Sequence, residues 1–485
     1  YQFSLLLGDG ITRKIDTNVG VKQGCPISPT LFNFYMSDLP DYLNDDECDP
    51  VLLDGRALFC LLYADDLVLL SQSQAGLQTS LDKLQHYCEK WHLKVNVKKT
   101  KVMIFNKSGH ILRGAKFYIN NSEVEVSGGY KYLGLMFTPS GIAKYAVKCL
   151  RDKALKSIFK LNKAFLGKPY NVKIGVHIFD SMVKPILLYG CETWGPQLVN
   201  FEKLLSVNVG KTKLYFDNLI EKTYIRWCKS LLGVNRKATN VAVLAELGQY
   251  PLTITIAVSI VKYWLRLLEY DCTSLVYKSY IENLTLLHEQ SSCWIKAVKD
   301  ILVATGFEQE WHNQHVPCVR QFLIDLEDKL KNIFDSQWRL DVFSDNRGVQ
   351  GEGNKLRTYR MYKCDIKFEP YLKLRNPSLR KNLTRFRISA HKLEIERGRY
   401  KVPKVSVSDR VCRHCNSGSI EDEKHVILDC TKYSSARKKL FDSFAILSTQ
   451  TGEEIFLQVM SCADMYLLNK LALFLDEVRK DRGGL

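Results

Sequence analysis

Two adjacent aspartates interrupt an apolar stretch of the sequence, LFCLLYADDLVLLS. Charged side chains are seldom buried unless they are paired or bind a metal ion, so Asp65 and Asp66 need a partner if the flanking strands are buried. Hard carboxylate oxygens suit Mg²⁺, and phosphoryl transfer commonly uses two such ions about 4 Å apart. The alternative is an exposed turn, because aspartate is common in turns.

A second set of candidate metal ligands lies near the end of the sequence. Cys412 and Cys415 form a Cys-x2-Cys pair, and His425 and Cys430 follow them. Three thiolates and one imidazole at such spacings predict a closed tetrahedral Zn²⁺ site, which is structural rather than catalytic. Unligated thiols beside a helical histidine remain the alternative.

The composition favours a partner that carries many negative charges. Lysine and arginine number 69 against 52 aspartates and glutamates, which gives this chain of 485 residues a formal charge of +17. Such an excess is typical of proteins that bind nucleic acid, although an anionic membrane would also attract it. The sequence lacks a run of about 18 apolar residues and a basic-then-apolar leader, so we expect a nuclear or cytoplasmic protein that is neither secreted nor membrane-spanning.

The apolar spacing predicts the elements that must position the aspartate pair. The segment SPTLFNFYMSDL predicts a helix with Ser28 as its cap and Pro29 at its first position. A second helix is predicted from Leu77, because apolar residues recur there at spacings of three and four. Between them, the apolar runs around YADD predict a tight hairpin, and residues 102–105 and 131–137 are expected to extend its antiparallel sheet.

Beyond about residue 143 the pattern is helical, with basic faces and tryptophans. Further amphipathic helices follow from residue 290, then the basic run LRKNLTRFRISAHKLEIERGRYK, and a last amphipathic helix is expected near 464–480.

The ordered series GVKQGCPISPTLF, YADD, WHLKVNVKKTKVMIF and YKYLG resembles the palm motifs of reverse transcriptases, in particular the LINE-type, non-LTR, jockey-like retrotransposon group. The segments KPILLYGCETW and LAELGQYPL and the cysteine cluster are similar to segments that follow the palm in such elements. The resemblance therefore extends over nearly the whole chain.

This resemblance implies an α+β fold with a truncated right-hand palm, built from an antiparallel sheet and helices. It implies five parts: a partial palm with primer grip at 1–140, a helical thumb and following helices at 141–290, a helical basic connector at 291–404, a zinc module at 405–440, and a C-terminal helix at 441–485. The implied activity is RNA-directed DNA synthesis, in which a primer 3′ hydroxyl attacks a dNTP. The implied partners are an RNA template, a DNA primer or target DNA, and dNTP. A membrane is not among the implied partners.

The family's catalytic roles transfer to residues of the YADD and KKT motifs. Asp65 resembles the metal-ligating carboxylate and Asp66 its companion, which together would hold Mg²⁺ or Mn²⁺. Tyr63 and Ala64 would shape the turn near the primer end. Lys99 would stabilise or protonate the leaving pyrophosphate, although a solvated lysine is the alternative.

Template, nucleotide and primer contacts are implied for two further motifs. Gly20, Gln23 and Gly24 resemble the platform for template and nucleotide, because glycine permits close backbone approach and the Gln amide both donates and accepts. An ordinary strand-to-helix turn would also explain those glycines. The primer grip corresponds to Tyr132, Leu133 and Gly134, which without this context would indicate only a buried strand.

The basic run before the cysteine cluster is expected to contact the phosphate backbone of template RNA or target DNA. The candidate residues are Arg385, Arg387, Arg397 and Arg399. A solvated charged face is the alternative interpretation of this run.

The sequence departs from the family pattern upstream of Gly20. The family needs a third carboxylate there, and the early acidic candidate, Asp9, has the context of a turn residue. We therefore expect a C-terminal fragment without endonuclease, fingers and first catalytic motif, inactive by itself in primer extension. A nucleic-acid-binding remnant or domesticated protein without catalysis is the rival interpretation, and a zinc-finger adaptor that binds proteins is a third.

Overall fold

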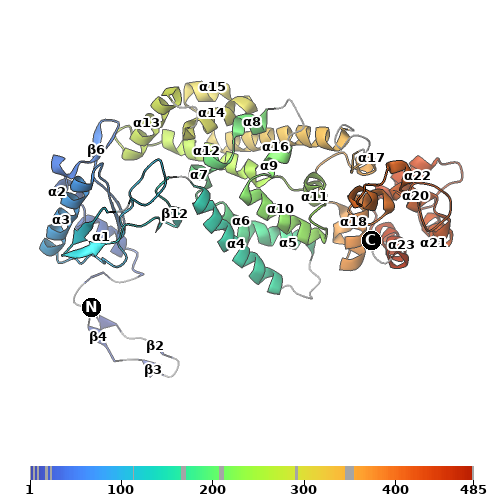
Figure 1. Ribbon diagram of the computed structural model, residues 1–485, viewed down its shortest axis with the longest axis horizontal. Helices are drawn as coiled ribbons and strands as arrows, with labels where there is room; N and C mark the ends of the chain where they lie inside the picture. The colour runs from blue at the N-terminus through green and yellow to red at the C-terminus, as the bar shows by residue number, and fades with distance from the viewer. Residues whose placement is uncertain are drawn as a thin grey trace. The chain divides into compact units, whose positions relative to one another are not determined.

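The computed structural model describes the chain except for residues 1, 4–5, 8–9, 12, 17–19, 22–23, 113, 142, 165–170, 207–211, 290–292, 345–353 and 483–485. The chain forms two compact units. Unit 1 comprises Tyr1–Gly141 with Cys272–Glu282, and unit 2 comprises Ile142–Asp271 with Asn283–Leu485 (Figure 1). Helices and small antiparallel sheets are mixed, in agreement with the expected α+β class. The finer division into thumb, connector and zinc module stays a prediction.

Unit 1 combines short helices with pairs of antiparallel strands. Its strands are β1 (Gln2–Phe3), β2 (Leu6–Leu7), β3 (Gly10–Ile11), β4 (Ile15–Asp16), β5 (Val51–Leu53), β6 (Arg56–Leu58), β7 (Cys60–Tyr63), β8 (Asp66–Leu69), β9 (Phe117–Ile119), β10 (Ser122–Val124), β11 (Tyr130–Tyr132) and β12 (Leu135–Phe137). Its helices are α1 (Ser28–Tyr35), α2 (Leu39–Tyr42), the 3-10 turn η1 (Asp46–Cys48), α3 (Gln74–Lys90) and the first part of α13 (Leu275–Glu289).

The prediction that residues 102–105 and 131–137 extend the sheet of the YADD hairpin is wrong. In the described part of the chain, β1 pairs with β4, β2 with β3, β5 with β6, β7 with β8, β9 with β10, and β11 with β12. Residues 102–105 form no strand there beyond a single parallel bridge between Val102 and Val126. Residues 131–137 lie in the β11–β12 hairpin, because Leu133 and Gly134 both have positive φ and reverse the chain.

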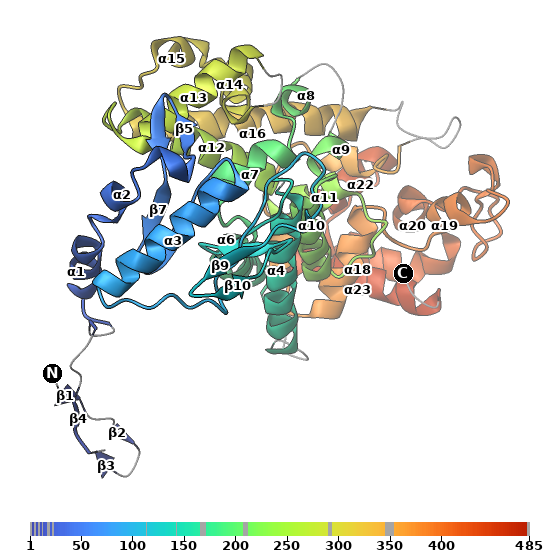
Figure 2. The same cartoon turned by 60° about the vertical axis from the view of Figure 1, so that its left-hand side comes forward.

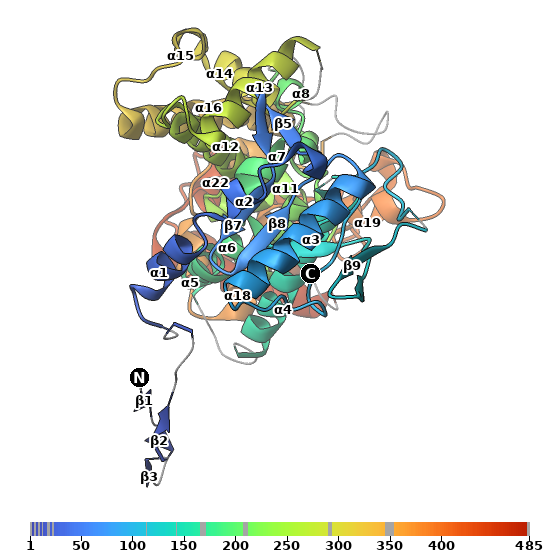
Figure 3. The ribbon, with the colours of Figure 1, turned by 90° about the vertical axis from the view of Figure 1, so that its left-hand side faces the viewer.

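Helix α3 carries the core of unit 1, and Figures 2 and 3 show it lying beside β7. Its buried residues Leu81, Leu84, Tyr87 and Cys88 follow the predicted helical spacing and pack in two clusters with α2, β7 and β9. Ser73 caps the helix by accepting a hydrogen bond from the Gly76 amide at 3.1 Å.

The expected cap of α1 is wrong by one position. Ile27 is the N-cap and makes no side-chain bond, whereas Ser28 is the first helical residue and Pro29 lies in the first turn. The missing NH of Pro29 removes a donor that the first turn leaves unpaired in any case, so the helix tolerates this start.

A close contact at Gly76 ties α3 to the base of the β7–β8 hairpin. A Cβ atom on Gly76 would lie 2.6 Å from the Cys48 carbonyl oxygen and 2.6 Å from the Asp49 Cβ. The Ser71 hydroxyl, just after β8, donates to the same Cys48 carbonyl at 2.9 Å. The hairpin and the helix that follows it are therefore held against the chain before β5.

Unit 2 is helical in its described part. Its helices are α4 (Lys144–Ala164), α5 (Val172–Ile178), the π-helical η2 (Phe179–Val183), α6 (Lys184–Leu187), α7 (Cys191–Leu198), α8 (Phe201–Leu205), α9 (Thr212–Tyr215), α10 (Leu219–Leu232), α11 (Asn240–Leu247), α12 (Leu252–Leu268), the rest of α13, α14 (Trp294–Thr305), α15 (Glu308–Asn313), α16 (Val319–Phe343), α17 (Tyr359–Tyr362), η3 (Pro370–Lys373), α18 (Pro377–Arg387), α19 (Glu394–Arg397), η4 (Gly398–Tyr400), η5 (Val407–Asp409), α20 (Glu423–Leu428), η6 (Thr431–Tyr433), α21 (Ser434–Ser443), α22 (Gly452–Met460) and α23 (Met465–Asp481).

The core of unit 2 is built around buried tryptophans. Trp264 on α12 and Trp338 on α16 are fully enclosed, and the Trp338 indole donates to the Val241 carbonyl of α11 at 3.3 Å. Helices α18 and α23 pack side by side farther along the chain (Figures 1 and 2). Among the described helices none is by itself long and apolar enough to cross a membrane, and two bent pairs, 172–187 with 191–198 and 240–247 with 252–268, meet the length and composition test only together.

Candidate functional site

The two aspartates lie at the tip of the β7–β8 hairpin. Tyr63 pairs with Asp66 across the ladder, and Ala64, with a φ of 52°, forms the turn with Asp65. The tight hairpin predicted from the sequence is thus confirmed. Its root is in the core through Cys60, whereas the side chains become exposed toward Tyr63 at the tip.

The expectation that this carboxylate pair is buried is wrong. Asp65 and Asp66 are both exposed, because an isolated two-stranded ladder covers its root and leaves its tip in solvent. Desolvation therefore does not require a cation here. The suitability of the pair for a metal depends instead on its chemistry: two adjacent hard-oxygen ligands, neither of which makes an ion pair with any described residue.

The structure brings the YLG turn into electrostatic contact with this tip. Burial raises the pKa of Tyr132, and the negative charge of Asp66 raises it further. Leu133 and Gly134, with φ of 43° and 88°, form the turn that follows Tyr132. The candidate primer grip and the candidate metal ligands therefore share one region of unit 1, although they are separated by a helix and several strands in the sequence.

The platform residues are only partly described. Gly20 and Gly24 are exposed with φ of 88° and 80°, a backbone conformation that other residues rarely adopt. Gln23 lies outside the described residues. Lys99 is exposed, and its amide donates to the Asn96 carbonyl at 3.0 Å, which is compatible with both the catalytic interpretation and the solvated lysine.

The predicted zinc ligands converge in unit 2. One ligand atom from each of Cys412, Cys415, His425 and Cys430 lies within 4.8 Å of the others, and all four residues are buried. The Cys415 sulfur is 3.3 Å from His425 Nε2, and the sulfurs of Cys412 and Cys430 are 3.9 Å apart. His425 Nδ1 is also buried and has no hydrogen-bond partner among the described residues. A buried set of three sulfurs and one imidazole fits a structural zinc ion.

Short local elements position these ligands. An antiparallel bridge between Val411 and Ile420 folds the first pair into a knuckle, and the Cys412 amide donates to the Ser419 carbonyl at 2.9 Å. Helix α20 carries His425, and the Asp422 carboxylate caps that helix by accepting from the His425 amide at 2.8 Å. Cys430 follows the helix end.

The arginines expected to bind nucleic-acid backbone differ sharply in exposure. Arg387 is only 3% exposed, and its guanidinium bonds to Glu246 at 3.0 and 3.2 Å and to Glu369 at 2.8 Å. A phosphate cannot reach it, so the role expected for Arg387 is wrong. The alternative interpretation, a solvated charged face, is wrong for Arg387 for the same reason.

The other three arginines are bound to different degrees. Arg385 is half-buried and donates to the Gly233 carbonyl at 3.1 Å, and Arg399 pairs with Glu396 at 3.2 Å. Arg397 has the most exposed side chain of the three and lies 3.2 Å from Glu394. Of the four, Arg397 is the residue most accessible to a phosphate, and backbone contacts by Arg385 and Arg399 stay predictions.

The buried carboxylates Glu246 and Glu423 were not predicted from the sequence as functional or structural partners. Glu246 lies within the apolar segment VAVLAELG on α11, and Glu423 begins α20. Glu423 accepts from Ser389 at 2.6 Å and from Arg357 at 2.8 Å, and lies 2.8 Å from His391 Nε2. Burial raises its pKa, but the Arg357 and His391 contacts outweigh this effect and hold it far below its ordinary value. The position of Glu246 inside an apolar helix was the sequence feature that could have identified it as a buried, paired carboxylate.

Comparison with known proteins gives the class of this site. The family model for reverse transcriptase (RNA-dependent DNA polymerase) matches residues 4–137, which include the aspartate hairpin and the Tyr132 turn. A retrovirus-related Pol polyprotein from the type-1 retrotransposable element R2 of Popillia japonica is 32% identical over 198 residues, 40% of this chain and 31% of that protein. The RNA-directed DNA polymerase from mobile element jockey of Drosophila melanogaster is 28% identical over 189 residues, 36% of this chain and 19% of that protein.

Residues 4–137 thus carry the sequence pattern of the reverse transcriptases. The similarity to the R2 and jockey proteins supports a reverse transcriptase of the LINE-type, non-LTR retrotransposon group. A Pol polyprotein from element R2DM of Drosophila melanogaster is also 35% identical over 130 residues, 25% of this chain. The chain spans at most about a third of the length of these relatives.

Proposed function

We propose that the protein containing this chain is an RNA-directed DNA polymerase of a non-LTR retrotransposon, with Asp65 and Asp66 in its catalytic centre. The observation that carries the proposal is the exposed, unpaired carboxylate pair at the hairpin tip, inside the segment that matches the reverse transcriptase family. The polymerase names of the relatives do not favour the rival interpretation of a binding protein without catalysis. Its partners are then an RNA template, a primer strand and dNTP.

The residues of the tip supply ligands and shape. Asp65 and Asp66 would hold Mg²⁺ or Mn²⁺, which supplies charge stabilisation to the attacking and leaving oxygens of phosphoryl transfer. Ala64 keeps the turn tight, since its positive φ lets Tyr63 pair directly with Asp66. Tyr132 stays protonated near Asp66, because burial and that carboxylate raise its pKa, so its hydroxyl is available to hydrogen-bond a primer phosphate.

Primer extension tests the proposal in the full-length protein that contains these residues. Wild-type protein should extend a primer on an RNA template in Mg²⁺, and Asp65→Asn should lower the rate at least about 100-fold, as for loss of one transition-state contact. Asp54→Asn is the matched control, because Asp54 is an exposed aspartate at the tip of the neighbouring β5–β6 hairpin. Equal activity of Asp65→Asn and Asp54→Asn would contradict the proposal. The inactivity expected of these 485 residues alone stays a prediction.

We also propose that the cluster of Cys412, Cys415, His425 and Cys430 binds one structural zinc ion. The support is the convergence of four buried ligands within 4.8 Å. Protein purified without chelator should contain one zinc per chain by elemental analysis, and Cys415→Ser should lose it. Cys462→Ser changes a cysteine outside the cluster and should keep the zinc. Well under one zinc in the wild-type protein would refute this assignment.

A further inference from the structure

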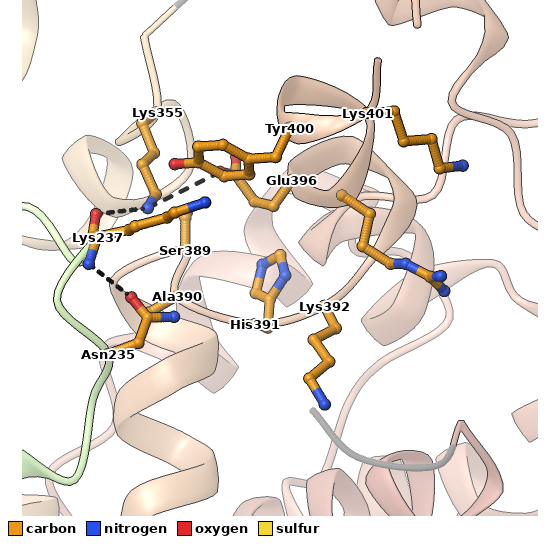
Figure 4. A pocket seen from close by; sticks show the side chains of 11 residues that line it. Asn235, Lys237, Lys355, Ser389, Ala390, His391, Lys392, Glu396, Tyr400 and Lys401 are labelled. Carbon is orange, nitrogen blue, oxygen red and sulfur yellow. Dashed lines mark hydrogen bonds and ion pairs between the residues drawn. The ribbon is translucent and has the colours of Figure 1, made fainter. Parts of the chain in front are cut away.

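A basic cavity of about 300 Å³ lies in unit 2, apart from both sites described above (Figure 4). Three separate segments form its wall: the loop after α10 with Asn235 and Lys237, then Lys355, and then residues 389–401. Ser389 and His391 lie on its buried side and are held by the Glu423 carboxylate. The cavity is therefore shaped by residues that other contacts already fix in place.

The charges around this cavity are not balanced. Its wall has five basic side chains and a single carboxylate, Glu396; the basic residues are Lys237, Lys355, Lys392, Arg397 and Lys401. Glu396 is already bound to Arg357 at 2.9 Å and Arg399 at 3.2 Å, with Lys355 at 3.9 Å. Glu394, which is not part of the wall, pairs with Arg397 at 3.2 Å and with Lys401 at 2.8 Å. These two carboxylates therefore have little capacity left to neutralise the remaining lysines.

Two of the lysines have no carboxylate partner in the part of the chain that the structure describes. Lys237 and Lys392 are both exposed, and neither makes an ion pair with any residue that the structure describes. The Lys237 ammonium instead lies 3.8 Å from the ring centroid of Tyr400, which fixes its position at the rim. A cation held in this way keeps its charge available to an anion.

Lys355 adds a preorganised donor. Its ammonium donates to the Lys237 carbonyl at 3.1 Å, so it links two of the three wall segments (Figure 4). Burial, together with the nearby guanidinium groups of Arg399 and Arg357, lowers its pKa. An anion in the cavity would offset both effects, since it would compensate the excess of positive charge.

We propose that this pocket binds one backbone phosphate, with its sugar, of a single nucleic-acid strand. The excess of cations selects an anion, and a volume of about 300 Å³ lies at the lower end of the ~300–1,000 Å³ range of ligand pockets, which limits the occupant to about one nucleotide unit. In protein–nucleic acid complexes, lysines and arginines most commonly contact the phosphate groups of the strand. The identity of the strand rests on the proposed polymerase function.

The test measures binding of a fluorescein-labelled single-stranded RNA to the full chain by anisotropy over a series of salt concentrations. The double variant Lys237→Gln/Lys392→Gln should weaken binding about tenfold, as expected for charge-assisted contacts. The slope of log K against log salt should become shallower by about 0.7, the value for one phosphate contact on a single strand. Both side chains are exposed and free of ion pairs, so the fold is expected to be retained and circular dichroism should be unchanged.

Two controls separate this pocket from general surface charge. Lys439→Gln removes an exposed lysine of α21 outside the pocket and should leave the salt slope unchanged, and Lys392→Arg should retain affinity. An unchanged slope in the double variant overturns the proposal. A mononucleotide that binds as tightly as the strand overturns its assignment to a strand.

Failure of the phosphate-pocket proposal can be distinguished from failure of the proposed polymerase function. Loss of RNA affinity in the double variant, with no polymerase activity in the full-length protein, would refute the polymerase proposal and support the pocket. Polymerase activity that depends on Asp65, with RNA binding unaffected by the double variant, would refute the pocket alone.

Discussion

Replacing Arg387 with methionine removes the cation at the centre of the buried ionic cluster of unit 2. The Arg387 guanidinium bonds to both oxygens of Glu246, to Glu369 and, at 2.7 Å, to the Met460 carbonyl. Its Cζ lies 4.8 Å from the ring centroid of Tyr362 and 5.1 Å from that of Tyr371. Methionine keeps much of the apolar volume and none of these bonds. Glu246, which is fully buried, is then left without its principal counter-charge.

The expected loss follows from that uncompensated charge. Removing one partner of a buried pair costs about 3–5 kcal/mol, because the remaining ion stays desolvated. Arg397→Met is the matched control: the Arg397 side chain is 58% exposed and contacts Glu394, which Lys401 also binds, so the change should cost under about 1 kcal/mol.

The pH dependence gives an independent signature. Burial raises the pKa of Glu246, but the charge and hydrogen bonds of Arg387, together with the charge of Lys363 and the Tyr371 hydroxyl, lower it below its ordinary value. Without Arg387, burial dominates and the folded-state pKa rises above the unfolded value. The contribution of this group to stability is then present at low pH and lost as the pH rises through the folded pKa. The variant should therefore be less destabilised at pH 5 than at pH 8.

Urea denaturation followed by tryptophan fluorescence measures both effects. The signal reports mainly unit 2, because six of the seven tryptophans lie outside unit 1. A free energy of unfolding for Arg387→Met within 1 kcal/mol of that for Arg397→Met, at both pH values, would show that the buried cluster does not stabilise the fold as described.

Two further changes test the packing of each unit. Gly76→Ala should destabilise unit 1 by about 1–3 kcal/mol, because the added Cβ would lie 2.6 Å from backbone at Cys48; unchanged melting by circular dichroism would contradict this close approach. Burial raises the pKa of Glu221 to about 7, although the Thr253 amide and hydroxyl bind one of its oxygens and lower it. The stability that this group contributes is therefore present below pH ~4.5 and lost as the pH rises toward 7, on the order of 3 kcal/mol. Glu221→Gln should abolish this part of the pH dependence, and identical pH profiles of unfolding for variant and wild type would disprove the assignment.

The sequence predicted those features that depend on neighbouring residues. Helix α3, the hairpin at Ala64 and the cluster of Cys412, Cys415, His425 and Cys430 each follow from spacing within a short segment, and the structure contains all three. Local periodicity and turn chemistry are sufficient for such elements.

The features that the sequence did not reveal depend on distant partners. Arg387 belongs to a run that has the composition of a surface helix, and it is buried because Glu246, far earlier in the chain, supplies its counter-charge. The exposure of Asp65 likewise depends on how the hairpin pairs. Among the described strands β7 and β8 pair only with each other, so the tip is uncovered. Apolar runs on both sides of a charge do not reveal whether further strands flank the pair.

Metal rescue of Asp65→Cys in the full-length protein tests most directly whether this side chain ligates a catalytic cation. Thiolate binds Mg²⁺ poorly and softer ions such as Cd²⁺ well. The variant should be inactive in primer extension with Mg²⁺ and regain activity when Cd²⁺ is added, whereas wild type should gain nothing from Cd²⁺. Full activity of the variant in Mg²⁺, or no recovery with Cd²⁺ in a variant that still folds and binds primed RNA, would contradict a metal-binding role for the hairpin tip.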